Sequence, residues 1–202
     1  MIEILKQSYG INSPIFIDDM VNISGHSRAR VNQLVKELVA NNQLAKFSDG
    51  IYYIPTVTMF GNSILDPRTV ITRKYLQDDS GQIGIYSGMS LLSFFGVTNQ
   101  VPSSYEIVTN NEATRVRSVA VGNLQVKLRR SRIKINNENY KVYQLLELMN
   151  QLDVKEKFPP EKIVQYIKDN NIKYADIAKY LEYFPAKVSK NLNRGGVLYA
   201  CL

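Results

Sequence analysis

Residues 24–55 read SGHSRARVNQLVKELVANNQLAKFSDGIYYIP, and this stretch decides the fold that we expect for the first part of the chain. Ser27 can cap a helix, because its hydroxyl can accept a hydrogen bond from a free backbone amide of the first turn. The apolar positions of that helix follow the helical period and are Val31, Leu34, Val35, Leu38 and Val39. Residues 44–47 and 50–54 predict two strands, and Asp49-Gly50 suits the tight turn of a hairpin.

The residues before this stretch predict two more short helices. Residues 1–9 place apolar side chains on one side of a helix that Gly10 ends, and residues 18–22 follow an extended segment at residues 14–16. Helix, helix, turn, helix and hairpin is the order of a winged helix-turn-helix domain, which we expect over residues 1–55. A small helical bundle that binds a protein is the alternative interpretation.

The remaining residues, 56–202, predict a mixed domain with a small antiparallel sheet and helices, so the expected fold class is α+β. Asp66-Pro67 is a typical start of a helix. Apolar and polar residues alternate for much of residues 105–135, as they do along strands, with a turn at Gly122-Asn123. The other elements expected here are a strand at 83–86, helices at 88–95, 140–152 and 161–170, and a helical end of the chain from 174 to 192.

The composition is that of a folded protein, and its charge favours an anionic partner. Of the 202 residues, 45% are hydrophobic and 21% are charged, which argues against a disordered chain. The formal net charge of +7 favours nucleic acid or an anionic surface as the partner. The single cysteine, Cys201, cannot form an internal disulfide, and no apolar stretch reaches the about 20 residues that a bilayer requires. We therefore expect a cytoplasmic protein that does not enter a membrane.

The first two turns of the helix that Ser27 caps carry polar side chains suited to reading DNA. In a helix that enters the major groove, arginine can contact guanine with two hydrogen bonds, and asparagine or glutamine can contact adenine. The residues that we expect to bind double-stranded DNA are Ser27, Arg28, Arg30, Asn32, Gln33 and Lys36, with Lys46 and Tyr52 beside the hairpin. The alternative is an ordinary solvated face of a surface helix.

A second group of basic residues lies between Glu112 and Glu138, with no acidic residue inside. Its members are Arg115, Arg117, Lys127, Arg129, Arg130, Arg132 and Lys134. Their alternation with apolar residues predicts that most of them share one face of a sheet. Because close like charges repel one another unless an anion is near, this face could meet DNA phosphates or an acidic patch on a protein partner. A solvated face without a dedicated partner is the third interpretation.

Sequence signatures of catalysis are sparse. The chain contains no GxSxG, Walker-type, HExxH, CxxC or dinucleotide-binding motif. Its only histidine, His26, lies in a predicted turn, and the chain lacks the histidine and cysteine ligands that zinc prefers. We therefore expect no catalytic residue, no metal and no cofactor.

Several segments, in order along the chain, resemble AbiEi-type antitoxins of abortive-infection, type IV toxin–antitoxin systems. In the predicted winged helix-turn-helix domain they are the helix after Ser27, FIDD at residues 16–19 and DGIYYIP at residues 49–55. Beyond that domain they are YSGMSLL at residues 86–92, FGVTNQVP at residues 95–102 and YEIVT at residues 105–109. The similarity covers residues 1–153, and the helical tail at residues 156–202 has no counterpart.

The resemblance implies a DNA-binding antitoxin that represses its own operon at inverted repeats. It also implies that the C-terminal part counteracts a nucleotidyltransferase-like toxin encoded beside it, which does not require a stable complex. The residues themselves leave three alternatives open. These are a stand-alone regulator whose second domain dimerises or senses a ligand, a nucleic-acid-processing enzyme or its scaffold subunit, and a winged helix that binds only protein.

Overall fold

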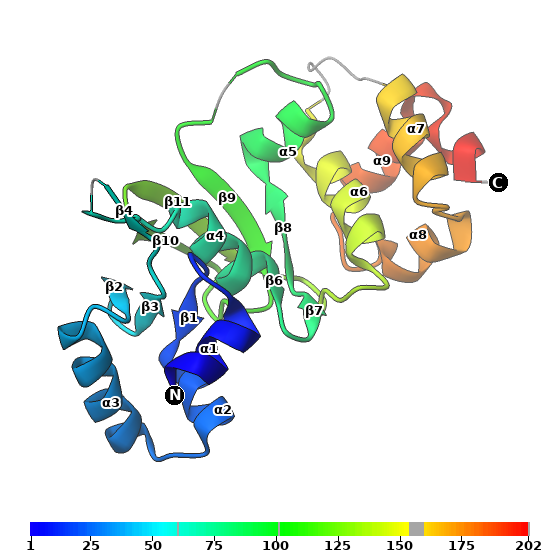
Figure 1. Ribbon diagram of the computed structural model, residues 1–202. Coiled ribbons are helices and arrows are strands. Elements are labelled where there is room, and N and C mark those ends of the chain that lie inside the picture. Colours follow the sequence, from blue (N-terminus) through cyan, green and yellow to red (C-terminus); the bar gives the residue numbers. More distant parts are fainter. Residues whose placement is uncertain (60, 101, 154–159, 202) are drawn as a thin grey trace. The chain divides into compact units, whose positions relative to one another are not determined.

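The computed structural model describes residues 1–59, 61–100, 102–153 and 160–201 (Figure 1). The chain forms two compact units, Met1–Arg73 with Val121–Asn123, and Lys74–Ala120 with Leu124–Leu202. The boundary predicted after Pro55 falls inside the first unit. Across the described ranges, no helix is both long and apolar enough to span a bilayer.

The first unit combines short helices with a three-stranded sheet. Its leading elements are α1 (Ile2–Tyr9), β1 (Ile15–Phe16), α2 (Ile17–Ser24), α3 (Arg28–Ala40), β2 (Ala45–Ser48) and β3 (Ile51–Tyr53). The order in the sheet is β1-β3-β2, and both neighbouring pairs are antiparallel. The sequence predicts the three helices and the hairpin correctly. The segment expected only to be extended, residues 14–16, contributes β1, which pairs with β3.

Local hydrogen bonds explain where α2 and α3 begin and end. At the start of α2, Asp19 Oδ2 accepts a hydrogen bond from the Phe16 amide at 2.9 Å. The helix ends at Gly25, whose φ of 65° is a left-handed conformation that glycine adopts at little cost. At the start of α3, Ser27 Oγ accepts a hydrogen bond from the Arg30 amide at 3.3 Å. The cap predicted at Ser27 is therefore confirmed.

Apolar side chains from every leading helix of the first unit meet in its core. The buried members are Leu5, Ile15, Ile17, Met20, Val31, Val35, Leu44 and Ile54. From α3, Val31 and Val35 are buried, and Leu38 and Val39 pack against this core. Four of the five positions predicted for the apolar stripe of α3 thus face this core, Leu34 is half-buried, and the polar side of the helix lies in solvent.

The first unit continues beyond the hairpin. The stretch predicted as a connector, residues 56–65, contains a short antiparallel pair, β4 (Val57–Thr58) and β5 (Gly61–Asn62). The helix α4 (Pro67–Ile71) then begins as predicted, because Asp66 Oδ1 accepts a hydrogen bond from the Arg68 amide at 2.9 Å.

The second unit contains a four-stranded sheet and most of the helices that the structure describes. A π-helical turn at Thr72–Leu76 spans the boundary between the two units. The strands are β6 (Gln77–Asp78), β7 (Gly81–Gln82), β8 (Gly84–Ser87), β9 (Tyr105–Thr109), β10 (Val116–Val121) and β11 (Leu124–Arg130). The helices are α5 (Gly88–Phe94), α6 (Tyr140–Gln151), α7 (Pro160–Asp169), α8 (Tyr174–Leu181), α9 (Ala186–Leu192) and a 3-10 helix (Arg194–Cys201).

The main sheet of the second unit is mixed, with the order β10-β11-β9-β8. The predicted turn at Gly122-Asn123 does join β10 to β11, and β8 pairs with β9 in the antiparallel direction. However, β11 runs parallel to β9, with Arg129 opposite Val108. The expectation of an antiparallel sheet is wrong for this pair, because alternation along 105–135 determines which side chains share a face and not which strands become neighbours.

Helix α6 forms the centre of the second unit's core. Its residues Leu145, Leu146, Leu148 and Met149 have no exposed surface. Ile135, which was expected on a strand, lies after the end of β11 and is buried in the same core. The expected helical tail appears as α7, α8, α9 and the 3-10 helix, while residues 156–159 and 202 of that expectation lie outside the described residues.

Candidate nucleic-acid interface

The polar side of α3 is exposed over its first turns. Every residue predicted there to bind DNA is exposed: Ser27, Arg28, Arg30, Asn32, Gln33 and Lys36. The turn at residues 25–27 separates α3 from α2, and the buried Val31 and Val35 hold α3 against the core. The structure therefore places these six residues on, or directly before, one helix with their side chains in solvent.

Both arginines of α3 have polar partners within the first unit. Arg28 Nη1 lies 2.5 Å from Asp18 Oδ1 on α2, with the two side chains 62% and 72% exposed. Arg30 Nη1 donates to Gln33 Oε1 at 3.3 Å. Exposed contacts of this kind contribute little stability, so another anion can take the place of the partner of the arginine. The sequence did not reveal that Asp18 would lie beside Arg28.

The hairpin of β2 and β3 places its two predicted residues differently. Lys46 is exposed, and its Nζ lies 2.6 Å from Asp49 Oδ1 in the turn. The hydrogen bond and charge of Asp49 raise the pKa of Lys46, and Lys46 lowers the pKa of Asp49 in return. Tyr52 is half-buried and packs against the core of the first unit. Its ring therefore supports the hairpin, and Lys46 is the more accessible of the two.

The second basic group does not occupy one face of the sheet. Lys127 and Arg129 are two residues apart on β11 and share a side, whereas Arg130 is on the other side. Arg115 precedes β10, and Arg132 and Lys134 follow the end of β11. The cause is the length of β11, which ends at Arg130 although the alternating pattern continues to Ile135.

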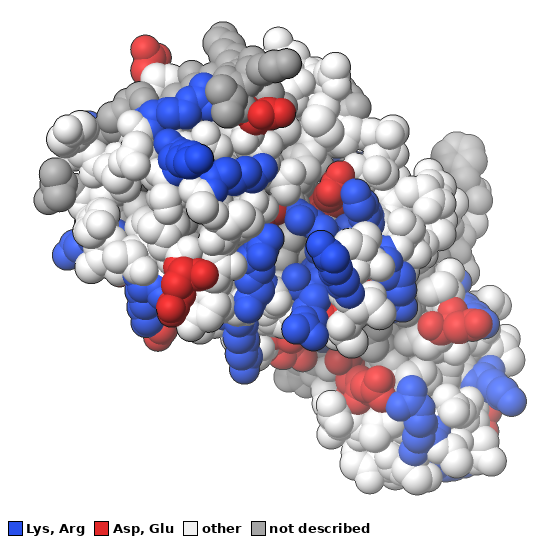
Figure 2. Space-filling view, turned by 180° about the vertical axis from the view of Figure 1, so that it is seen from behind, with Lys and Arg blue, Asp and Glu red and all other residues white. Residues whose placement is uncertain are grey.

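Acidic residues outside the basic segment form ion pairs with three members of this group. Arg117 Nη2 lies 2.9 Å from Glu112 Oε2, Lys127 Nζ lies 3.7 Å from Glu106 Oε2, and Arg129 pairs with Glu147. On the face drawn in Figure 2, Lys and Arg side chains gather near the middle and most Asp and Glu side chains lie around them. Within the described part of the chain, Arg115, Arg130, Arg132 and Lys134 form no ion pair.

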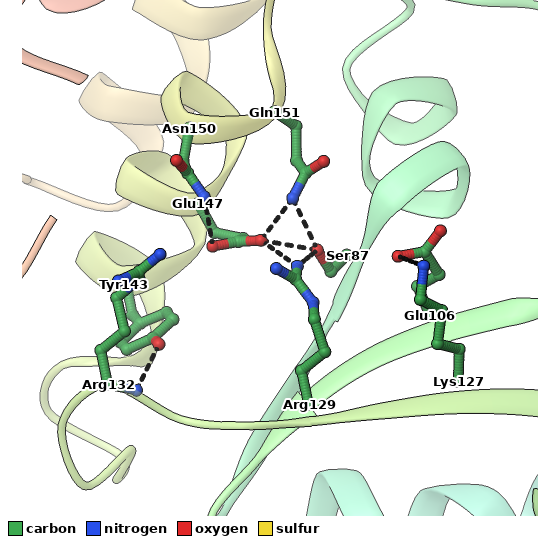
Figure 3. A network of polar contacts seen from close by, with 9 residues as sticks. All are labelled: Ser87, Glu106, Lys127, Arg129, Arg132, Tyr143, Glu147, Asn150 and Gln151. Atoms are coloured by element: carbon green, nitrogen blue, oxygen red, sulfur yellow. Dashed lines mark hydrogen bonds and ion pairs between the residues drawn. The ribbon is translucent and has the colours of Figure 1, made fainter. Parts of the chain in front are cut away.

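Glu147 is the centre of a buried polar network (Figure 3). Its carboxylate, 2% exposed, lies on α6 and pairs with Arg129 of β11. Ser87 Oγ and Gln151 Nε2 donate to Glu147 Oε1 at 2.7 Å each, and Asn150 Nδ2 donates to Oε2 at 3.4 Å. A buried carboxylate is stable only with such partners. The sequence offers one signal for this network, the single carboxylate of Glu147 within the otherwise apolar run 145–149.

The network forms one side of a pocket of about 270 Å³ in the second unit. Its lining residues are Val108, Arg115, Val116, Arg129, Arg130, Arg132, Tyr143 and Glu147. Tyr143 is held in place by its hydroxyl, which accepts a hydrogen bond from the Arg132 amide at 2.9 Å. Burial raises the pKa of Tyr143 to about 12, so this ring is neutral at physiological pH. The pocket is thus lined mainly by positive charge.

No family model and no curated protein matches the chain. In the part of the chain that the structure describes, no group of three or more histidine, cysteine, aspartate or glutamate side chains could hold a metal ion. What the structure defines is a mixed α+β protein with two positively charged features, the exposed side of α3 and the arginine-lined pocket.

Proposed function

We propose that this chain is a DNA-binding repressor whose first unit acts as a winged helix-turn-helix domain. The observation that carries the proposal is the exposed polar side of α3, which follows the Gly25 turn and is fixed by a buried apolar side. The three-stranded sheet packed beside three helices supports the same reading. The polyanionic partner that a net charge of +7 favours is then double-stranded DNA.

In the proposed complex, α3 lies in the major groove. Asn32 and Gln33 read adenine edges, and an arginine pairs with guanine, each good bidentate contact contributing about 1–3 kcal/mol of discrimination. Arg28 exchanges its exposed contact with Asp18 for DNA, because that pair is weak in water. Ser27 and Lys36 lie at the two ends of the reading surface, where phosphates are nearest.

The hairpin contributes a backbone contact in this proposal. Lys46 is exposed and its partner Asp49 is 99% exposed, so a phosphate oxygen can replace the carboxylate. Tyr52 holds the hairpin against the core of the first unit and does not contact a base. Lys46→Ala should accordingly weaken binding to all DNA sequences by a similar factor, and Tyr52→Ala should act through the stability of the first unit.

The proposed biological role is that of an antitoxin that represses its own operon in the cytoplasm and counteracts a nucleotidyltransferase-like toxin. The support for the antitoxin role is the resemblance of residues 1–153 to AbiEi-type antitoxins, which includes β8, α5 and β9. The proposed activity is binding and includes no catalytic step. The pocket in the second unit favours one alternative, a stand-alone regulator whose second unit senses a ligand.

Two experiments test these proposals separately. Footprinting of the purified chain on the DNA upstream of its own gene should protect inverted repeats, and a scrambled duplex should compete poorly. Protection without sequence preference, or none, would contradict operator recognition. Co-expression with the product of the adjacent gene should restore growth if that product is a toxin. Operator binding without rescue would leave the stand-alone regulator as the function.

A further inference from the structure

The pocket in the second unit gathers an excess of positive charge. Four of its eight lining residues are arginines and one is a glutamate. The arginines come from three consecutive parts of the chain, with Arg115 before β10, Arg129 and Arg130 on β11, and Arg132 beyond it. We propose that this pocket binds a small molecule through a phosphate or diphosphate group, a function in addition to the DNA binding proposed for α3.

Acidic side chains of the described residues do not neutralise the positive charge of the pocket. The Glu147 carboxylate is already engaged by Arg129, Ser87 and Gln151, so it has little capacity left for other cations. The remaining three arginines have no carboxylate partner in the described residues. Guanidinium groups held close together repel one another, and a multiply charged anion between them removes that repulsion.

Contacts with neighbouring side chains hold two of these arginines in place. Arg129 is 23% exposed, and its Nη2 donates to Ser87 Oγ at 2.5 Å as well as pairing with Glu147. Arg132 lies over the Phe184 ring, with Cζ 5.5 Å from the ring centroid. Side chains held in this way lose less freedom when a ligand binds.

One N–H group of the arginines that line the pocket also has no hydrogen-bond acceptor among the described residues. Arg129 Nε is buried and makes no hydrogen bond to the described residues. Buried donors are nearly always satisfied by protein, water or a ligand, and exceptions concentrate where something else binds. An oxygen atom brought in by an anion, with a small shift of the guanidinium, would satisfy it.

The chemistry of the lining selects the class of ligand. Arginine presents donors in a planar fork that matches the oxygens of phosphate. Val108 and Val116 provide apolar surface for a small organic part. A volume of about 270 Å³ is just below the range of about 300–1,000 Å³ found for drug-sized ligands, so the ligand is small.

The test uses the full chain and inorganic pyrophosphate as the probe, with isothermal titration calorimetry at constant ionic strength. The variant Arg115→Gln/Arg130→Gln/Arg132→Gln removes three charges from the pocket and retains the Arg129–Glu147 pair. The matched control, Lys168→Gln/Lys179→Gln/Lys190→Gln, removes three exposed charges from α7, α8 and α9 of the same unit. We expect stoichiometric binding by the wild type and the control, and a loss of at least about tenfold in affinity for the pocket variant.

Several results would overturn the proposal. One is the absence of pyrophosphate and inorganic phosphate binding to the wild type, and another is an equal loss in the control, which would indicate net charge alone. DNA provides the remaining comparison. If the pocket variant loses affinity for operator DNA and the wild type does not bind pyrophosphate, the arginines bind DNA phosphates instead. Retained operator binding together with lost pyrophosphate binding supports a separate small-molecule site. Failure of α3 to bind DNA would leave this test unaffected.

Discussion

Replacing Arg129 by methionine tests how much the buried pair with Glu147 contributes to the free energy of unfolding. The Glu147 side chain is 2% exposed and Arg129 is 23% exposed, so the charge left behind in Arg129→Met cannot be solvated without rearrangement. Loss of one partner of a buried ion pair typically costs about 3–5 kcal/mol. Ser87, Gln151 and Asn150 would still donate hydrogen bonds to the carboxylate, so we expect a cost at the lower end of that range, about 3 kcal/mol.

The double variant Arg129→Met/Glu147→Leu distinguishes an unpaired charge from a simple loss of packing. Because no unpaired charge then remains, it should recover part of the lost stability, although Ser87 and Gln151 lose their acceptor in this variant. Urea unfolding at pH 7 of the wild type, the two single variants and the double variant gives the coupling energy of the pair. A coupling energy below about 0.5 kcal/mol, or a double variant less stable than Arg129→Met, would refute the account of this network.

The remaining predictions concern the fold and its dependence on pH. Ser27→Ala removes the cap of α3 and should cost about 1 kcal/mol, measured as a lower urea midpoint, whereas Ser27→Asp should retain most of that stability. Leu5→Ala removes a fully buried side chain from the first unit and should cost about 2–5 kcal/mol in the same assay, and a cost near zero would place Leu5 outside the core. Burial alone would raise the pKa of Glu112, but hydrogen bonds from Thr114 and from Arg117 outweigh it and lower the pKa. The stability that this carboxylate contributes is therefore present above the pKa of the unfolded chain, about 4.3, and is lost as the pH falls through the lower folded value. The wild type should lose stability relative to Glu112→Gln between about pH 5 and pH 3, and parallel curves for the two proteins would contradict this assignment.

The parts of the fold that local signals determine could be predicted from the sequence. The helix α3 has a cap at Ser27 and a complete apolar stripe, and both features depend only on residues within that helix. The turn at Gly122-Asn123 is equally local. The start of α4 follows from the Asp66-Pro67 pair for the same reason.

The features that sequence analysis missed depend on residues far apart in the chain. No local pattern indicates that β9 would pair with β11 in the parallel direction, because that choice depends on how the intervening residues return to the sheet. The basic group appeared free of acidic residues for a related reason. Glu106 and Glu147 lie outside the segment 112–138 but next to Lys127 and Arg129 in space. The sequence likewise does not show that four arginines line one pocket, because this depends on contacts between separate parts of the chain.

The most direct test of the central claim is a titration of operator DNA with the wild type, Asn32→Ala and Lys36→Ala, each at two salt concentrations. Asn32→Ala should lower the affinity for operator DNA by roughly 5- to 150-fold, with little effect on a scrambled duplex, because it removes a base contact. Lys36→Ala should weaken binding to both duplexes and reduce the salt dependence by about one phosphate contact. A control variant, Lys168→Ala on α7, should bind as the wild type does. If Asn32→Ala binds the operator as tightly as the wild type, or if the wild type shows no salt-dependent affinity for DNA, then α3 is not a DNA-reading helix and the account is contradicted.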